Sequence, residues 1–272
     1  MNKIIGQLEM KAKQIRLDVV QMIGVGKAGH LGGSCSAADI VTALYFHKMR
    51  IRPMDPGWAD RDRLILSKGH AAIVQYAALA ELGYFPKEEL GRLKKLGAIL
   101  QGHPDMRKIP GIEANTGSLG QGLSISCGIA AGGKLDQKNY RVYCIIGDGE
   151  IAEGQIWEAA MAASFYKLDN LVGFLDNNGI QATGPIIERF DSNPLADKWK
   201  AFGWHVIEID GHDMKQILKA LDDAEAVRGK PVMIIARTVK GKGVSFAENS
   251  AAFHNASLTQ EQFDQACREI AG

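Results

Sequence analysis

The sequence predicts an α/β fold in which a mostly parallel sheet is covered by helices on both faces. Short, almost wholly apolar runs alternate with segments of helical periodicity, and strands that are apolar on both sides are typical of buried parallel sheets. No internal repeat, low-complexity tract or convincing linker interrupts this alternation. Because 272 residues suit one large domain better than two, we expect a single domain over residues 1–272.

The first half of the chain is predicted to be mainly helical. Apolar residues at helical spacing predict a long first helix over 4–22, which ends near Gly24 and Gly26. A second helix is expected to begin at Ser36, which would act as its N-cap. The remaining elements expected here are a short strand at 63–67, a helix at 71–82, a helix begun by Pro86 within 86–96, and a closely packed buried helix at 119–131.

The second half is predicted to alternate strands and helices. Apolar, β-branched runs at 140–146 and 171–175 predict two buried strands. Between them, apolar residues from Ile151 to Ala163 recur at near-helical spacing and predict a helix. The later elements expected are a helix at 194–202, a strand at 204–209, a helix at 214–227, a strand at 231–236 and a last helix at 259–270.

The composition excludes several classes of function. Hydrophobic residues make up 46% and charged residues 23%, and the net charge of +1 offers no basic field for nucleic acid. No apolar stretch is long enough to span a membrane and no signal peptide is evident, so we expect a cytoplasmic protein. Four scattered cysteines without a CxxC pair predict buried free thiols.

Two motifs at predicted strand ends indicate a metal and diphosphate site. Gly147-Asp148-Gly149 follows the strand at 140–146, and Asn177-Asn178 follows the strand at 171–175. Alone, each would most often be a surface turn. Together they place polar groups where open α/β sheets bind ligands, and Asp148, an Asn side chain and a loop carbonyl would suit Mg²⁺, which takes about six oxygen ligands.

A third glycine motif is excluded as a nucleotide site. The segment 24–29 fits the dinucleotide pattern GxGxxG. However, it follows a segment of helical periodicity, and the strand that such a site requires is missing.

Histidines in turns are the second group of candidate site residues. Four of the seven stand in turns rich in glycine or serine, namely His30, His70, His103 and His254. Imidazoles on loops at sheet ends can donate to hydroxyl and phosphate oxygens and relay protons near neutral pH. We assign structural roles to His47, inside a predicted helix, and to His205, inside a predicted strand.

These motifs occur in an order that is found in transketolases. They are Gly29-His30, Ser67-Lys68-Gly69-His70-Ala71, Gly102-His103-Pro104, the turn 117–122, Gly147-Asp148-Gly149, Asn177-Asn178, Asp210-Gly211-His212-Asp213 and Lys240-Gly241-Lys242-Gly243. From the first helix to His254, the chain resembles the N-terminal, diphosphate-binding (PP) domain of a thiamine-diphosphate-dependent transketolase.

The resemblance implies a role for each matching position. The metal ligands it implies are Asp148, Asn178 and Ile180, through its carbonyl, with Mg²⁺ as the ion and Ca²⁺ or Mn²⁺ able to take its place. The cofactor contacts it implies are His70, Gly117, Ser118, Leu119, Gly149, Asn178, Lys240 and His254. His30, His103 and His254 resemble the residues that face the donor sugar and move its protons, and Glu153 and Glu158 resemble the acids that link two cofactor sites across a dimer interface.

The resemblance also implies a reaction and a partner. Transketolases transfer a two-carbon ketol unit from a ketose phosphate to an aldose phosphate, and the cofactor acts as the electron sink while a carbon–carbon bond breaks. Typical members are more than twice as long, and their following domain supplies the glutamate that activates the cofactor. We therefore expect the N-terminal subunit of a split transketolase, which pairs with a separate C-terminal subunit in an α₂β₂ assembly.

Two positions depart from the family pattern. Gly33 stands where some relatives carry a serine that contacts the cofactor, and His254 is followed by Asn255 rather than glycine. The departures leave one cofactor hydrogen bond and the alignment of one loop open.

Two other functions stay open from the residues. The α subunit of a 2-oxo acid dehydrogenase also carries a Gly-Asp-Gly and an asparagine pair, but His30, His103 and the turn 67–70 disfavour it. A non-catalytic thiamine-diphosphate-binding module would need no histidines that move protons.

Overall fold

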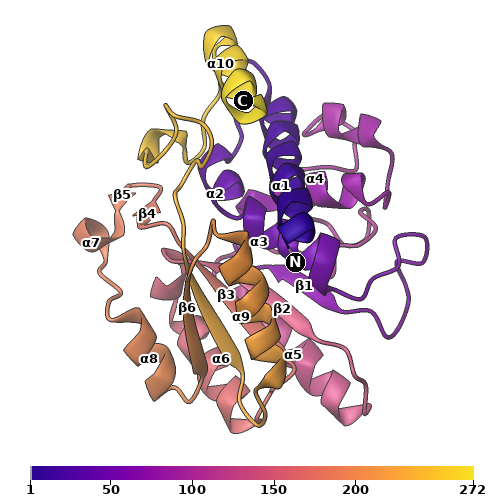
Figure 1. Ribbon diagram of the computed structural model, residues 1–272, viewed down its shortest axis with the longest axis vertical. Helices are drawn as coiled ribbons and strands as arrows, with labels where there is room; N and C mark the ends of the chain where they lie inside the picture. Colours follow the sequence, from indigo (N-terminus) through magenta and orange to yellow (C-terminus); the bar gives the residue numbers. More distant parts are fainter. Residues whose placement is uncertain (1) are drawn as a thin grey trace.

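A five-stranded parallel sheet forms the centre of the molecule (Figure 1) in the computed structural model, which describes residues 2–272. In spatial order the strands are β1 (Arg63–Leu66), β2 (Val142–Gly147), β3 (Leu171–Asn177), β7 (Val232–Arg237) and β6 (His205–Asp210). Each neighbouring pair is parallel. The predicted fold class is therefore confirmed.

Alternate residues of each strand pack into two separate apolar cores, one on each face of the sheet. Tyr143 and Ile145 of β2 face one core, whereas Cys144 and Ile146 face the other. The first core contains the helices α1 (Asn2–Ile23), α3 (Ala38–Ala43), α4 (Ala72–Glu81), α9 (Met214–Ala226) and α10 (Gln260–Ala271). The second contains α5 (Gln121–Leu135), α6 (Gly154–Phe165) and α8 (Leu195–Ala201). The apolar character of both strand faces thus follows from double burial.

The parallel register brings the carboxyl ends of four strands to one edge of the sheet. Leu66 pairs with Ile145, Gly147 with Asp176, and Asn177 with Arg237. The loops that follow these strands therefore meet, as expected for the ligand-binding edge of an open α/β sheet.

Three expectations about helices need correction. Ser36 is the last residue of α2 (Leu31–Ser36) and not an N-cap, because its hydroxyl donates to the carboxylate of Asp176 at 2.6 Å. The segment 86–96 forms only a 3₁₀ turn at Lys87–Arg92, in which no residue is buried. Only Leu90 of this turn packs against the core, which is too little apolar contact to hold an α-helix. The helix at 119–131 is α5, and only one of its faces is buried; a Cβ at Gly128 would meet nothing within 4 Å.

The other predicted helices and strands are present, with ends shifted by a few residues. No sequence signal pointed to a small hairpin, β4 (Ile180–Gln181) with β5 (Gly184–Pro185), or to the short helix α7 (Ile186–Arg189) after it. In Figure 1 the C-terminal α10 lies beside α1, against which it packs.

Two predictions from composition can be compared with the structure. Among the described residues, no helix has the length and apolarity that a membrane crossing requires. The four cysteines are free thiols, of which Cys35, Cys127 and Cys144 are buried and Cys267 is partly buried.

Candidate functional site

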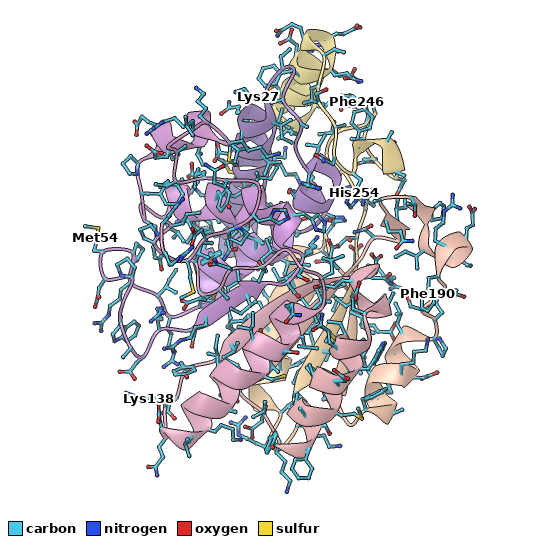
Figure 2. All side chains as sticks on the ribbon, turned by 180° about the vertical axis from the view of Figure 1, so that it is seen from behind. Lys27, Met54, Lys138, Phe190, Phe246 and His254 are labelled. Carbon is cyan, nitrogen blue, oxygen red and sulfur yellow. The ribbon has the colours of Figure 1, made fainter. Side chains whose placement is uncertain are left out.

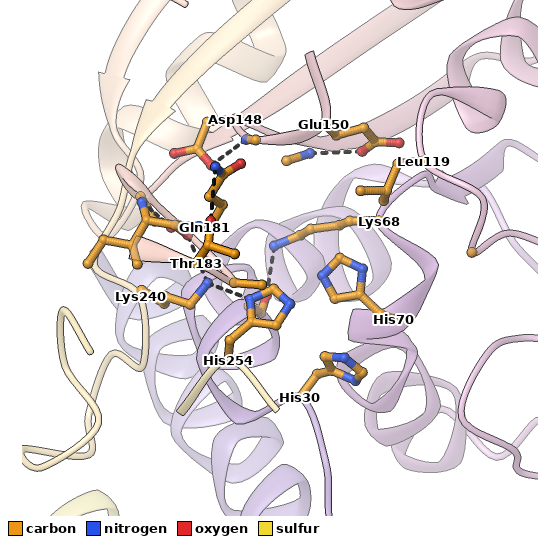
Figure 3. A pocket seen from close by; sticks show the side chains of 17 residues that line it. His30, Lys68, His70, Leu119, Asp148, Glu150, Gln181, Thr183, Lys240 and His254 are labelled. Carbon is orange, nitrogen blue, oxygen red and sulfur yellow. Dashed lines mark hydrogen bonds between the residues drawn. The ribbon is translucent and has the colours of Figure 1, made fainter. Parts of the chain in front are cut away.

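A cavity of about 360 Å³ lies at the carboxyl edge of the sheet. Asp148 and the rings of His30, His70 and His254 lie on opposite sides of it, with Lys68 and Lys240 between them in the view of Figure 3. Its other lining residues are Gly33, Gly117, Leu119, Gly147, Gly149, Glu150, Asn178, Ile180, Gln181, Ala182 and Thr183. The two turns predicted from the sequence thus meet at one cavity.

Asp148 is a buried carboxylate with room for a cation. It is 4% exposed, and its two oxygens accept hydrogen bonds from the backbone N–H of Gly149 at 2.8 Å and of Gly179 at 2.5 Å. Burial, reinforced by the charge of Asp176, raises the pKa of Asp148 to about 7. The ionised carboxylate is therefore incompletely compensated by the protein, and a bound cation would favour it.

Asn178 and Ile180 line the same cavity as Asp148 and carry further oxygen atoms that could bind a cation. Gly179 has a φ of +76°, a conformation that favours glycine, and it turns the chain between them. The Asn178 Oδ1 accepts from the Ile180 N–H at 3.1 Å, and the Ile180 carbonyl accepts from Lys240 Nζ at 2.8 Å. Among the described residues no three His, Cys, Asp or Glu side chains gather as a metal site. A cation would therefore rely on carboxylate, amide and carbonyl oxygens, which are hard ligands.

A buried ion pair that the sequence reasoning missed lies beside the cavity, and its lysine, Lys68, is one of the lining residues. Asp176 is fully buried and accepts hydrogen bonds from Lys68, from Ser36 and from the hydroxyl of Thr238. Lys68 Nζ also donates to the carbonyl of Gly33 at 2.7 Å. Although burial alone would raise the pKa of Asp176, the Lys68 ammonium holds that pKa below its usual range. The pair joins the ends of β1, β3, β7 and α2.

Glu150 was also missed, and its carboxylate connects the turn 117–122 with the turn 147–149. The residue is 2% exposed, and its carboxylate accepts hydrogen bonds from the N–H of Gly147 at 3.0 Å, the N–H of Gly120 at 2.8 Å and the hydroxyl of Ser67. Burial raises the pKa of Glu150. The only signal in the sequence was its place directly after Gly149.

The three histidines form a compact cluster. The ring centroids are 4.8 Å apart for His30 and His70, 5.2 Å for His70 and His254, and 5.4 Å for His30 and His254. Burial is the main cause that lowers the pKa of His30 and of His254 to about 4 and of His70 to about 2, and neighbouring positive charges add to it. All three imidazoles are therefore neutral near pH 7 and each has a nitrogen that can accept a proton.

Lys240 connects the histidines with the oxygen donors. It is 2% exposed, and its Nζ lies 3.0 Å from His254 Nδ1 while it donates to Ile180. Burial, together with the charge of Lys68, lowers the pKa of Lys240 to about 8. It still carries a positive charge at pH 7, in a place where an anion could be bound.

Some predicted site residues do not line the cavity. His103 is exposed and lies beside Gly117, where an added Cβ would come 2.6 Å from the imidazole. Ser118, Glu153 and Glu158 are also exposed. The predicted roles of these four residues stay predictions. Conversely, Gln181 and Thr183 of the hairpin line the cavity, and no sequence signal pointed to them.

Comparisons with known proteins agree with the motif order. The family described as "Transketolase, thiamine diphosphate binding domain" matches residues 8–272. The chain is 48% identical to the 6-deoxy-6-sulfo-D-fructose transketolase subunit SqwG of Clostridium sp. (strain MSTE9), over 97% of this chain and 96% of that protein. It is 42% identical to one of the subunits of the apulose-4-phosphate transketolase of Phocaeicola vulgatus, over 97% of this chain and 94% of that protein.

A solved structure gives the same result for the fold. The transketolase from Leishmania mexicana superposes with a TM-score of 0.92 at 31% identity, over 97% of this chain and 41% of that one. The chain therefore spans about two fifths of the solved transketolase chain. The resemblance inferred from the ordered motifs is confirmed.

Proposed function

The chain belongs to the transketolase family and carries its thiamine-diphosphate-binding domain, and we propose that it is the N-terminal subunit of a two-component enzyme. In this proposal it takes part in the transfer of a two-carbon ketol unit from a ketose phosphate to an aldose phosphate. The observation that carries the proposal is one cavity that joins oxygen donors for a cation, two lysines and a cluster of neutral histidines. The cytoplasmic location expected from the sequence stays a prediction.

The residues around the cavity fit thiamine diphosphate. Lys240 and His70 offer N–H donors for phosphate oxygens, and the glycine turn at Gly117, with a φ of +150°, leaves backbone accessible where a side chain would strike His103. Gly149 leaves similar space beside Gln181, which an added Cβ would approach to 3.1 Å. When bound, the cofactor supplies the electron sink for carbon–carbon bond cleavage.

The residues also fit a divalent cation at Asp148. The support is the buried, incompletely compensated carboxylate together with the Asn178 amide and the Ile180 carbonyl. Mg²⁺ commonly takes one or two carboxylates and completes its shell with substrate phosphate oxygens and water. We therefore propose Mg²⁺ as the physiological ion at this position, with Ca²⁺ or Mn²⁺ as substitutes.

The histidine cluster suits proton movement at a sugar. His30 and His254 are neutral at pH 7, so each has a ring nitrogen that can accept a hydrogen bond or a proton from a sugar hydroxyl, although their lowered pKa values make them weaker bases than a free imidazole. His103, outside the cavity lining, would join them from its rim. This chemistry favours a transketolase over a non-catalytic binding module, and the names of the two relatives do not favour a 2-oxo acid dehydrogenase.

Exposed large apolar side chains support the proposal of a second polypeptide. Large apolar side chains at the ends of α5 and α6 and on and after α7 are exposed, namely Leu135, Met161, Phe165, Tyr166, Ile187 and Phe190. Figure 2 shows Phe190 at the edge of the molecule. Phe165 and Tyr166 lie together, with ring centroids 5.0 Å apart, and neighbouring exposed apolar side chains of this kind mark interaction sites. We propose that the partner is a separate C-terminal transketolase subunit, in an α₂β₂ assembly.

The proposed activity is tested by reconstitution. The chain is assayed alone and together with the product of the adjacent gene, with xylulose 5-phosphate, apulose 4-phosphate or 6-deoxy-6-sulfofructose as donor and ribose 5-phosphate as acceptor. We expect ketol transfer only from the pair. Full turnover by the chain alone would refute the two-component proposal, and a pair active only with 2-oxo acids would refute the transketolase assignment.

The metal assignment is tested by Asp148→Ala in the same complex. Because the variant lacks the buried carboxylate, calorimetry should show loss of Mg²⁺-dependent thiamine diphosphate binding. Asp197→Ala, which removes a carboxylate whose side chain is 75% exposed on α8, is the control and should bind normally. Equal Mg²⁺ dependence in the wild type and in Asp148→Ala would show that the metal lies elsewhere.

A further inference from the structure

The motif Asp210-Gly211-His212-Asp213 has no part in the proposed chemistry, and the structure gives each of its residues a contact. The Asp213 carboxylate caps α9 by accepting from the N–H of Lys215 and Gln216. An added Cβ on Gly211 would stand 2.5 Å from Thr238, so this position has room only for glycine. The Asp210 carboxylate accepts from the His212 N–H at 2.8 Å and fixes the loop.

His212 connects two segments that are far apart in the sequence. Its Nδ1 lies 2.6 Å from the carboxylate of Asp39 on α3, and its Nε2 accepts from the backbone N–H of Val239 at 2.8 Å. Asp39 is in turn held by Arg16 of α1, with a hydrogen bond of 3.1 Å from Nη1 and a shorter one from Nη2. The three side chains are almost buried, with 8% of Arg16, 8% of Asp39 and 13% of His212 exposed.

The contacts determine the tautomer of His212. A backbone N–H can only donate, so the Nε2 that receives the Val239 N–H carries no proton. The proton of the neutral ring is therefore on Nδ1 and is donated to Asp39. Although burial alone would raise the pKa of Asp39, the Arg16 guanidinium and His212 hold it below its usual range, so the acceptor is a carboxylate. The chain Arg16–Asp39–His212 thus ends on one backbone amide.

That amide belongs to the residue directly before Lys240. Other hydrogen bonds hold the backbone at Lys240 itself and at the residue after it. The Gly241 N–H donates to the carbonyl of Gly32 at 3.0 Å, and the Lys240 carbonyl accepts from Asn249 at 2.9 Å. The lysine stem passes close to Gly32, where an added Cβ would stand 2.8 Å from Lys240 Cγ. The position of Nζ, 2.8 Å from Ile180 and 3.0 Å from His254, therefore depends on a fixed backbone at 239.

We propose that His212 is a positioning residue for Lys240, because it holds the backbone amide of Val239. Loss of the His212 side chain should therefore weaken cofactor binding more than it lowers turnover. The inference rests on the proposed role of Lys240 toward thiamine diphosphate. It assigns a function to a motif none of whose residues lines the cavity.

The test is a double-mutant cycle in the reconstituted complex, read out as thiamine diphosphate affinity and as turnover at saturating cofactor. His212→Ala should lower the affinity about tenfold, the size expected when one hydrogen bond to a buried backbone group is lost. Turnover at saturation should change less than twofold. When His212→Ala is combined with Lys240→Ala, the loss of affinity should be smaller than the product of the two single losses, because both substitutions act through the same lysine side chain.

Three measurements separate positioning from general destabilisation. His212→Gln, which keeps one donor and one acceptor in a carboxamide, should recover most of the affinity. His205→Ala, which removes an exposed histidine at the other end of β6, should bind like the wild type. Hydrogen exchange of the segment 238–241 in the chain without cofactor should quicken in His212→Ala and not in His205→Ala.

The outcomes distinguish the two proposals. Unchanged affinity in His212→Ala, fully multiplicative losses with Lys240→Ala, or unchanged exchange at 238–241 would each overturn the positioning role. A complex that binds no thiamine diphosphate, or in which Lys240→Ala binds normally, would instead refute the proposed cofactor site. In that case faster exchange in His212→Ala would still establish that His212 holds this backbone.

Discussion

Removing the Lys68 ammonium should strongly destabilise the chain, because it leaves the Asp176 carboxylate buried without its counter-charge. The side chain of Lys68 is 3% exposed and that of Asp176 is 0% exposed. Breaking a buried pair by removing one partner costs about 3–5 kcal/mol. For a chain of this size, that loss corresponds to a fall of about 6–20 °C in the melting temperature. Because Ser36 and Thr238 still donate to Asp176, we expect Lys68→Met near the lower end of this range.

The assay is thermal unfolding of the purified chain, with two further variants as references. Lys87→Met removes a lysine that is 56% exposed in its pair with Glu81, and such pairs contribute about 0–1 kcal/mol. Lys68→Met with Asp176→Asn removes both charges of the buried pair and should recover much of the stability. A Lys68→Met loss no larger than that of Lys87→Met, or no recovery in the double variant, would refute the reasoning.

The pH dependence of the stability of Lys68→Met provides a second, independent test. In the wild type, Lys68 holds the pKa of Asp176 below its usual range against the effect of burial, so the contribution of Asp176 is present above that range and is lost as the pH falls. Without Lys68, burial would raise this pKa, and the folded state would favour protonated Asp176. The deficit of Lys68→Met relative to the wild type should therefore be larger at pH 8 than at pH 5.

Two further predictions concern packing and pH. Gly69→Ala would place a Cβ 2.5 Å from the carbonyl oxygen of Thr116, and such overpacking should lower the free energy of unfolding by about 1–3 kcal/mol. Gly128→Ala lies in open space on α5 and should instead raise the free energy of unfolding by about 0.5–1 kcal/mol. Thermal unfolding compares the two, and equal effects would contradict the contact. The pKa values of His30 and His254 are lowered from 6.5 to about 4, so the unfolded chain binds more protons in this interval and stability should fall as the pH drops through it. In the double variant His30→Asn with His254→Asn, the melting temperature should fall less over this pH interval than in the wild type. An equal fall would show that these two histidines are not the cause.

The sequence predicted the parts of the site that follow from strand ends. Asp148 and Asn178 lie within three residues of the ends of the apolar runs 140–146 and 171–175, and parallel neighbouring strands must bring such positions to one edge. The prediction needed only the order of residues along the chain. The ends of most helices and strands could likewise be placed within a few residues, because periodicity and turn residues are also local properties of the sequence.

The missed residues depend on contacts between distant segments. Lys68 and Asp176 are 108 positions apart, and Ser36 is 140 from Asp176. Their meeting requires the strand order and the path of α2, neither of which periodicity specifies. Ser36 illustrates the error that results: a serine before a helical run favours an N-cap, but here a buried carboxylate receives its hydroxyl.

The buried charges at the carboxyl edge of the sheet explain why this arrangement calls for both a cation and an anion. Among the described residues, the carboxyl groups of Asp148, Glu150 and Asp176 and the ammonium groups of Lys68 and Lys240 are buried there. If all five are ionised, three negative and two positive charges leave one excess negative charge, which is consistent with the raised pKa of Asp148. A divalent cation would reverse the sign of this sum, and a diphosphate would then meet a positive surface. The two ligands should therefore bind cooperatively, because each removes the electrostatic cost of the other.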